Sequence, residues 1–238
     1  MSITLLKALT AAGFGARRTV AQAVKDGRVS LNGQLAVSFS QIITSKDIIL
    51  FDGKLVGRST EKPIYLLLNK PAGVLSTTYD ERGRQTIVDL VPAKYRSTSL
   101  HLVGRLDLAS RGLMLLTTDG ELTHHLTHPR FEKEKEYLVT LSHALTPTDK
   151  TAFEQGLELD DGITSPTRVV DVSLKPPAYR VTLHEGRKRQ IRRMFQSLGY
   201  EVRDLKRTRL GSLRLGTLKE GMARELTEDE IKGLGKDK

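Results

Sequence analysis

An aspartate in a short polar run is the first group in this sequence whose surroundings favour chemistry. Asp107 ends the run Gly104-Arg105-Leu106-Asp107, in which a guanidinium stands two residues before the carboxylate. A carboxylate held beside a carbon that becomes cationic can stabilise that cation or capture it covalently, as carboxylates do in glycosidases. Taken alone, such a run is by default an ion pair in a surface loop, so the rest of the chain must decide.

The densest run of positive charge lies in residues 187–195. Ile191, Phe195 and Leu198 recur at intervals of four and three, which predicts a helix with one apolar face that ends at Gly199. Such a helix could be a solvated surface helix, could lie on a membrane or could face RNA, and the density of cations favours RNA. The cations on the rest of its surface are Lys188, Arg189, Arg192 and Arg193, and Arg203, Lys206, Arg207 and Arg209 extend the basic character.

The composition agrees with a polyanionic partner. The chain has 38 Lys and Arg against 28 Asp and Glu, a net charge of +10, and phosphate contacts by these side chains supply most non-specific nucleic-acid affinity. No apolar run approaches the roughly 20 residues that span a bilayer, and the N-terminal residues lack a secretory pattern. The absence of cysteine excludes disulfides and thiolate metal sites. We therefore expect a cytoplasmic protein.

Residues 1–57 are predicted to form a small α+β unit. Leu5 and Leu9 repeat at helical spacing, and a second helix is predicted from about Arg17. Apolar residues on both sides of Asn32-Gly33 predict a β-hairpin. Several cations could share one surface of this unit: Arg17, Arg18, Lys25 and Arg28.

The remainder of the chain divides into a linker at 58–63, a larger domain at 64–232 and a polar tail at 233–238. Ile64 to Leu68 is a continuous apolar run that predicts a buried strand, and further strands alternate apolar and polar residues. These strands are too closely spaced for a regular βαβ series. We expect an α+β domain built on a mostly antiparallel mixed sheet with flanking helices.

Local signals predict where several elements of this domain begin and end. Thr146 and Pro147 begin a helix that Gly156 ends, and Thr227 with Glu230 forms a capping box for a short final helix. The apolar run Leu113 to Leu116 is expected to be a strand that the turn at Asp119-Gly120 closes.

The larger domain resembles the RNA pseudouridine synthases, specifically the RsuA-type branch that modifies ribosomal RNA. The resemblance covers nearly all of residues 63–232, and its motifs occur in the expected order. A lone Gly-Arg-Leu-Asp would be a weak signal, whereas the full set is specific. The motifs are Asn69-Lys70-Pro71-Ala72-Gly73-Val74, Val103-Gly104-Arg105-Leu106-Asp107 with residues 112–122, Lys135-Glu136-Tyr137, and residues 186–195.

The small unit resembles the S4 RNA-binding domain through residues 13–19 and 27–33. The family usually has Ser where Ala16 stands, and that Ser would cap the second helix. Losing the cap costs about 1 kcal/mol and leaves the surface intact. The resemblance implies RNA binding, in place of a merely solvated basic face.

These resemblances imply a role for each candidate residue. Asp107 would be the catalytic carboxylate, acting on the sugar either covalently or by abstracting a sugar proton to give a glycal. Arg192 would pair with Asp107 and oppose the rise in its pKa on burial. Tyr137 would stack on the target base, and Ile191 would be an apolar wall. The remaining substrate contacts would come from Arg105, Lys188, Arg189 and Arg193.

No metal or other cofactor is expected, because His124 and His128 lack an accompanying general-base Glu or thiolate. The expected partner is ribosomal RNA or a ribosomal precursor particle, not a membrane, and self-contained domains favour a monomer. The Arg-Lys-Arg-Gln-Ile-Arg-Arg form is closer to the large-subunit members of the family. A non-catalytic RNA-binding or ribosome-assembly factor on the same scaffold is the alternative, and a membrane-surface protein is a third.

Overall fold

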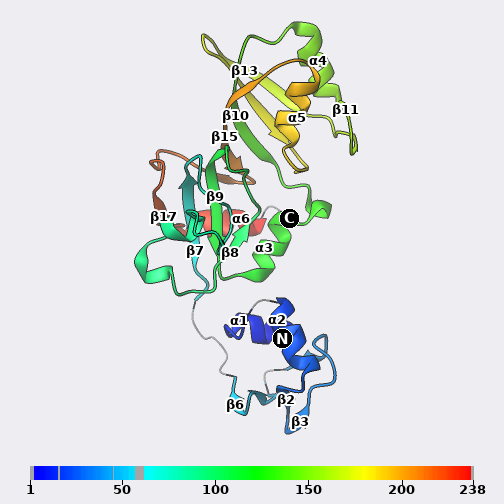
Figure 1. Cartoon of the computed structure of the whole chain (residues 1–238), viewed down its shortest axis with the longest axis vertical. Coiled ribbons are helices and arrows are strands. Elements are labelled where there is room, and N and C mark those ends of the chain that lie inside the picture. The colour runs from blue at the N-terminus through cyan, green and yellow to red at the C-terminus, as the bar shows by residue number, and fades with distance from the viewer. Residues whose placement is uncertain (1–2, 16, 45, 57–61, 237–238) are drawn as a thin grey trace. The chain divides into compact units, whose positions relative to one another are not determined.

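The computed structural model describes residues 3–15, 17–44, 46–56 and 62–236. The chain divides into two compact units, Met1–Pro63 and Ile64–Lys238. Figure 1 shows the elements of each unit. Ala16, and with it the question of a missing helix cap, lies outside the described residues, as does most of the expected linker.

The first unit is a small α+β structure, as its sequence predicts. Helices α1 (Leu5–Ala11) and α2 (Arg17–Lys25) bury Leu5, Leu9 and Val20 against a small sheet. The Asn32-Gly33 turn joins the first two strands of that sheet, and both turn residues have positive φ. The four-stranded sheet has the order β3 (Gln34–Leu35), β2 (Val29–Leu31), β5 (Ile49–Phe51) and β6 (Lys54–Leu55), and β1 (Ile3–Thr4) pairs with β4 (Ile42–Ile43).

The second unit is built on one large mixed sheet. Its main path runs β13-β14-β10-β15-β9-β7-β17, with β16 on β15 and β8 on β9, and the pairing of β15 with β9 is its one parallel pairing among the described residues. The mostly antiparallel α+β architecture is therefore confirmed. The strands are β7 (Tyr65–Lys70), β8 (His101–Val103), β9 (Arg111–Thr117), β10 (Lys135–Leu141), β13 (Arg168–Leu174), β14 (Pro177–Leu183), β15 (Val202–Leu210), β16 (Leu213–Arg214) and β17 (Ala223–Glu225), and a separate hairpin pairs β11 (Glu158–Leu159) with β12 (Gly162–Ile163).

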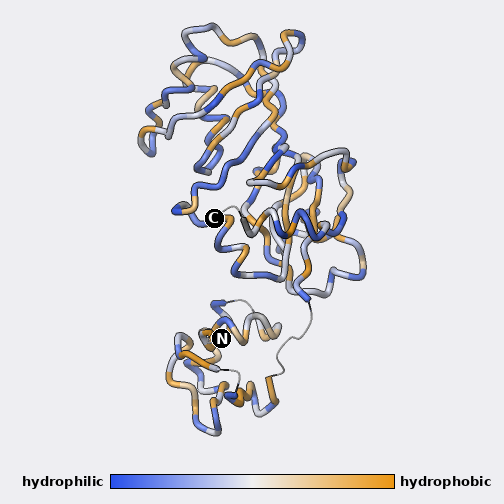
Figure 2. The backbone as a smooth tube through the Cα atoms, turned by 180° about the vertical axis from the view of Figure 1, so that it is seen from behind, coloured by the Kyte–Doolittle hydropathy of each residue, from blue (hydrophilic) through white to orange (hydrophobic). Residues whose placement is uncertain are grey.

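The centre of this sheet is buried on both faces. Leu67 of β7 packs into one cluster, and its neighbours Leu66 and Leu68 pack into another on the opposite face. Strands covered on both sides read as continuous apolar runs, because neither set of alternate side chains meets water. Figure 2 shows hydrophobic segments along these central strands. A third cluster lies under α5 at the far end of the sheet, around Val139 and Phe195.

The helices flank the two ends of the sheet (Figure 1): α4 and α5 lie at the β13–β10 end, and α3 and α6 at the β9–β7 end. Within the described part of the chain, no helix has the length and apolar character needed to cross a membrane. The helices are α3 (Gly120–Thr127), α4 (Pro147–Gln155), α5 (Gln190–Ser197) and α6 (Glu228–Lys236), with short 3-10 turns at Ile87–Leu90, Ala93–Tyr95 and Pro129–Phe131.

Three expected boundaries differ from the structure. Asp119 does not merely close a strand: its carboxylate accepts hydrogen bonds from two backbone N–H groups and caps α3. Helix α5 begins only at Gln190, because Arg189 has a left-handed backbone with φ of 51°. Helix α6 continues to Lys236 and fully buries Leu234, so the segment beyond 232 is not simply a polar tail.

Gly112 allows the one parallel contact between β9 and β15. Its φ is +106°, and a Cβ built there would lie 2.3 Å from the carbonyl oxygen of Arg207. We expect Gly112→Ala to lower the free energy of unfolding by about 3 kcal/mol. Alanine is strained at this φ, and its Cβ would overlap the backbone of Arg207. Chemical denaturation measures the loss. Gly216→Ala, at a positive φ in open space, should cost only about 1 kcal/mol, and equal losses in both variants would contradict the assignment.

Candidate active site

A cavity of about 990 Å³ opens in the second unit. Its walls come from the loop after β8, the face of β10, the segment between β14 and α5, and the end of β15. The cavity brings together residues far apart in the sequence, six of which are among those expected to bind or react with substrate: Arg105, Asp107, Tyr137, Lys188, Arg189 and Ile191.

Asp107 lies half-buried at the edge of this cavity. Gly104, with φ of +75°, turns the chain out of β8. The hydroxyl of Ser76 then holds the loop from both sides, since it donates to the carbonyl of Leu106 at 2.7 Å and accepts from that residue's N–H at 3.2 Å. Among the described residues, the Asp107 carboxylate has no hydrogen-bond partner and no cation within 4.0 Å. A carboxylate held in place yet unpaired is free to act on a bound molecule.

The side chain of Lys70 also holds the loop that carries Asp107. Its side chain is fully buried, and Nζ donates to the carbonyl oxygens of Pro71 and Ser110, both at 2.8 Å. The carbonyls of Leu108 and Asp107 lie at 3.4 and 3.5 Å. Burial lowers the pKa of Lys70 to about 8, and the nearby charges of Asp107 and Glu220 oppose that shift. The lysine of the Asn69-Lys70-Pro71 motif is thus a clamp on the loop that carries Asp107.

Tyr137 and Ile191 form walls of the cavity. Tyr137 lies on β10, half-buried between two of the hydrophobic clusters. Ile191 is 4% exposed and belongs to the cluster under α5 as well as to the cavity lining. A role in the core and a role beside the ligand are therefore compatible for Ile191.

Arg192 does not line the cavity, and the expected ion pair with Asp107 is not formed. Its guanidinium donates to the backbone carbonyls of Val202 at 3.0 Å and Ala109 at 3.2 Å. Burial and the charge of Arg189 lower the pKa of Arg192, while Asp107 is near enough to oppose the shift. Arg192 therefore holds the chain two residues beyond Asp107 and contributes positive charge at longer range.

The other cations expected to contact substrate lie at or just before the start of α5, and only some of them line the cavity. Lys188 and Arg189 precede it, are exposed and line the cavity. Arg193 was expected to contact substrate, but it does not line the cavity: it forms ion pairs with Asp160 and Asp161. The two acidic residues belong to the β11–β12 hairpin, which no local pattern connects to the basic segment.

Two cations are among the cavity residues to which the sequence assigned no role in the site. Lys135 and Arg207 both line the cavity, and Arg207 is 2% exposed. Lys135 could have been inferred from the sequence. It lies two residues before Tyr137 in a predicted strand, and alternate strand residues share a face. Arg207 was expected only as one of the cations that extend the basic segment, since the direction of its side chain depends on a bulge in β15.

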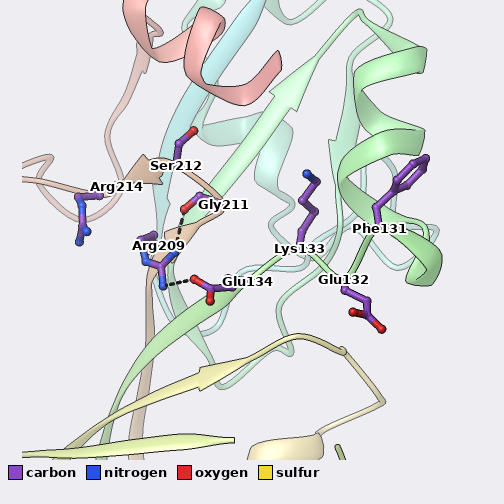
Figure 3. Close-up of a pocket in the computed structure, with 8 residues that line it drawn as sticks. All are labelled: Phe131, Glu132, Lys133, Glu134, Arg209, Gly211, Ser212 and Arg214. Carbon is purple, nitrogen blue, oxygen red and sulfur yellow. Dashed lines mark hydrogen bonds and ion pairs between the residues drawn. The ribbon is translucent and has the colours of Figure 1, made fainter. Parts of the chain in front are cut away.

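Figure 3 shows the residues that line a second, smaller cavity of about 450 Å³, among them Arg209 of β15. Arg209 is held there by Glu134, at 2.8 Å, and by the carbonyl of Gly211, at 3.0 Å. Lys133 lines both cavities. Arg207 and Arg209 therefore line different cavities, although they are only two residues apart in the sequence.

In the first unit, Arg17, Arg18 and Lys25 are exposed on α2. Arg28, which was expected to join them, instead pairs with Asp52, with Nε to Oδ1 at 2.9 Å, and lies over the ring of Phe51. The hydrogen bond and charge of Arg28 lower the pKa of Asp52. Arg28 therefore has a carboxylate partner, although its side chain remains 48% exposed.

The rings of the His-rich segment form an aromatic cluster in which neighbouring rings are tilted or edge-on. The rings of His124 and His128 lie 4.9 Å apart, and the ring of His125 lies 4.2 Å from that of Phe131. Residues 3–15, 17–44, 46–56 and 62–236 contain no group of three or more His, Cys, Asp or Glu placed to hold a metal ion.

Comparisons with known proteins agree with this site. The family model described as RNA pseudouridylate synthase matches residues 64–197. The ribosomal large subunit pseudouridine synthase B of Bacillus subtilis is 37% identical over 234 residues, which are 97% of this chain and 94% of that protein. The protein of the same name from Vibrio cholerae is 36% identical over 90% of this chain and 68% of its own length. A crystal structure of a pseudouridylate synthase superposes with a TM-score of 0.71 and 32% identity, covering 98% of this chain and 99% of that one. These matches agree with the mostly antiparallel sheet and with the cavity around the unpaired Asp107. The chain belongs to the RNA pseudouridine synthase family.

Proposed function

We propose that this protein isomerises a specific uridine to pseudouridine in ribosomal RNA, and specifically in the large subunit. The observation that carries the proposal is the cavity that both the unpaired Asp107 carboxylate and Tyr137 line. The names of the relatives from B. subtilis and V. cholerae support the large-subunit substrate.

The reaction exchanges one bond for another within the nucleotide. The N1–C1′ bond breaks with its electron pair on the base, the uracil turns, and C5 bonds to C1′. C5 then loses a proton and N1 gains one, so the composition is unchanged. Positive charge develops on the sugar, and a carboxylate can stabilise it or bond to C1′. We assign this step to Asp107.

The other candidate residues take supporting parts in this proposal. Tyr137 stacks on the target base, which must leave its helix before C1′ is accessible. Arg105, Lys188 and Arg189 are exposed at the cavity and suit contacts with the RNA backbone. Arg192 supports the Asp107 loop through Ala109 and offsets the cost of burying that carboxylate. Arg193, held by Asp160 and Asp161, stabilises the hairpin instead.

The first unit is proposed to be an S4-like RNA-binding domain. In Arg17→Gln/Arg18→Gln, we expect weaker RNA binding and a decrease of about 2 in the slope of log affinity against log salt, because each cation contacts a phosphate. Filter binding at several salt concentrations measures the slope. Turnover at saturating RNA should not change. Arg168→Gln/Lys175→Gln removes the same charge on β13 and in the turn that follows it, and an equal loss of slope in that variant would contradict the assignment.

Release of tritium from RNA labelled at uracil C5 tests the activity, because the C5 proton is lost only when the new bond forms. Mapping pseudouridine in ribosomal RNA from a deletion strain then identifies the site. Binding of RNA without any release would favour the alternative, a non-catalytic ribosome-assembly factor. We further propose that the protein acts in the cytoplasm as a monomer on ribosomal RNA or a precursor particle.

A further inference from the structure

Arg207 and Lys135 line the cavity that contains Asp107, and neither forms an ion pair with a carboxylate. Arg207 donates from Nε to the carbonyl of Leu113 at 2.8 Å, and its Nη2 lies 3.2 Å from the sulfur of Met114. Lys135 donates to the carbonyl of Lys133 at 2.9 Å. Within the described residues, neither Arg207 nor Lys135 has a carboxylate within 4.0 Å.

A bulge in β15 aims Arg207 into the cavity. Tyr137 faces Arg207 across the strands, while the preceding Glu136 faces Arg209, so Thr208 is the extra residue. Opposed residues share a face, and the bulge therefore places Arg207 beside Tyr137 and Arg209 on the other side of the sheet. The ion pair of Arg209 with Glu134 in Figure 3 belongs to that other side.

Arg207 also reaches the loop that carries Asp107. Its Nη1 lies 3.9 Å from the position that a Cβ would take at Gly104. Lys135 lies two residues before Tyr137 and shares its face. Arg207 thus lies beside the strand position of Tyr137 and near the loop that carries Asp107, and Lys135 lies on the same face of β10 as Tyr137.

Buried charge without a counterion is costly, and the cost is seen at Lys135. Burial and the charge of Arg207 lower the pKa of Lys135 to about 8, although Glu185 opposes the shift. Such an arrangement persists where a ligand supplies the missing negative charge. Because Arg207 is 2% exposed, a flipped planar base can reach it more readily than a backbone phosphate.

We infer that Arg207, assisted by Lys135, forms the subsite for the carbonyl oxygens of the target uracil and stabilises the negative charge that the base acquires. The inference rests on the proposed function. When the N1–C1′ bond breaks, the electron pair left on N1 is shared with O2 and O4. Donors fixed beside those oxygens stabilise the separated base without being reorganised. Arg207 and Lys135 keep their protons throughout and only donate hydrogen bonds.

Single-turnover rates at saturating RNA test the inference. In Arg207→Met we expect a rate about 10²-fold lower, and in Lys135→Met about tenfold lower, with the dissociation constant for RNA within about twofold of wild type. Arg209→Met, on the same strand but the opposite face, should keep the wild-type rate. Circular dichroism identifies folded variants, and if Arg207→Met does not fold, Arg207→Lys and Lys135→Met provide the measurement.

A substrate with 5-fluorouridine at the target position separates charge stabilisation from damage to the fold. Fluorine stabilises the uracil anion, so the loss caused by Arg207→Met, measured as consumption of the fluorinated nucleotide, should be several-fold smaller than with uridine. An equal loss with both substrates, an unchanged rate, or a loss confined to RNA affinity would overturn the inference. If instead the wild-type protein releases no tritium from C5-labelled RNA, the proposed function fails.

Discussion

Asp107→Asn should bind RNA as well as the wild-type protein and yet lose its isomerase activity by at least about 10³-fold. The amide keeps the size and the loop contacts of the residue, because the hydrogen bonds that hold this loop are made by backbone groups, by Ser76 and by Lys70. What it removes is the negative charge that must face the sugar cation. Tritium release and filter binding on the same RNA measure the two quantities separately.

Affinity is the informative control in this comparison. Removing a negative charge beside a polyanion cannot weaken binding electrostatically, so the affinity of Asp107→Asn should be equal or slightly higher. The control is Asp171→Asn. It removes an exposed carboxylate of β13 that pairs with Lys150 of α4, and it should retain full activity. Activity within about tenfold of wild type in Asp107→Asn would show that another group performs the chemistry.

Lys70→Met is expected to lower both stability and turnover. Methionine fills nearly the same volume but leaves the carbonyls of Pro71 and Ser110 without their donor, at a cost of about 2 kcal/mol in the free energy of unfolding. The released loop can displace Asp107, and a shift of about 1 Å at a reacting group can lower the rate about 10²-fold. Urea denaturation and tritium release measure these losses. Lys94→Met, at an exposed ion pair with Glu225, should change the free energy of unfolding by less than about 1 kcal/mol.

The pH dependence of the same variant tests the buried charge. The pKa of Lys70 is lowered by burial from 10.5 to about 8. As the pH rises through this window, the folded protein releases the proton before the unfolded chain does, so stability rises. The cost of burying the charge is fully present below pH 8 and disappears toward pH 10.5. The stability of wild type relative to Lys70→Met should therefore increase between pH 7.5 and 9.5, and a constant difference would show that the buried amine does not titrate there.

Several elements could be predicted from the sequence because their signals act within a few residues. The helix after Thr146 begins with that residue accepting from the N–H of Asp149 and ends at Gly156, as predicted. The capping box at Thr227 and Glu230 forms in both directions. Continuous apolar runs became central strands because both faces of the sheet are covered there.

The direction of individual cations could not be predicted. Arg192 and Arg193 are neighbours on α5, but one holds the Asp107 loop and the other pairs with a hairpin more than thirty residues away. The choice depends on where Asp160 and Asp161 lie in three dimensions. Arg28 likewise pairs with Asp52, which lies 24 residues further along the chain in the turn after β5.

By itself, the sequence determined the type of protein, its larger α+β domain and the identity of its candidate carboxylate, because these follow from local patterns and from motifs in order. The tertiary structure decided which groups surround that carboxylate. Lys70 approaches the Asp107 loop only because β7 pairs with β9, where Lys70 faces Gly112. Arg207 enters the cavity only because one extra residue in β15 reverses the side-chain alternation. Strand pairing and bulges are contacts between distant segments, and no local pattern encodes their register.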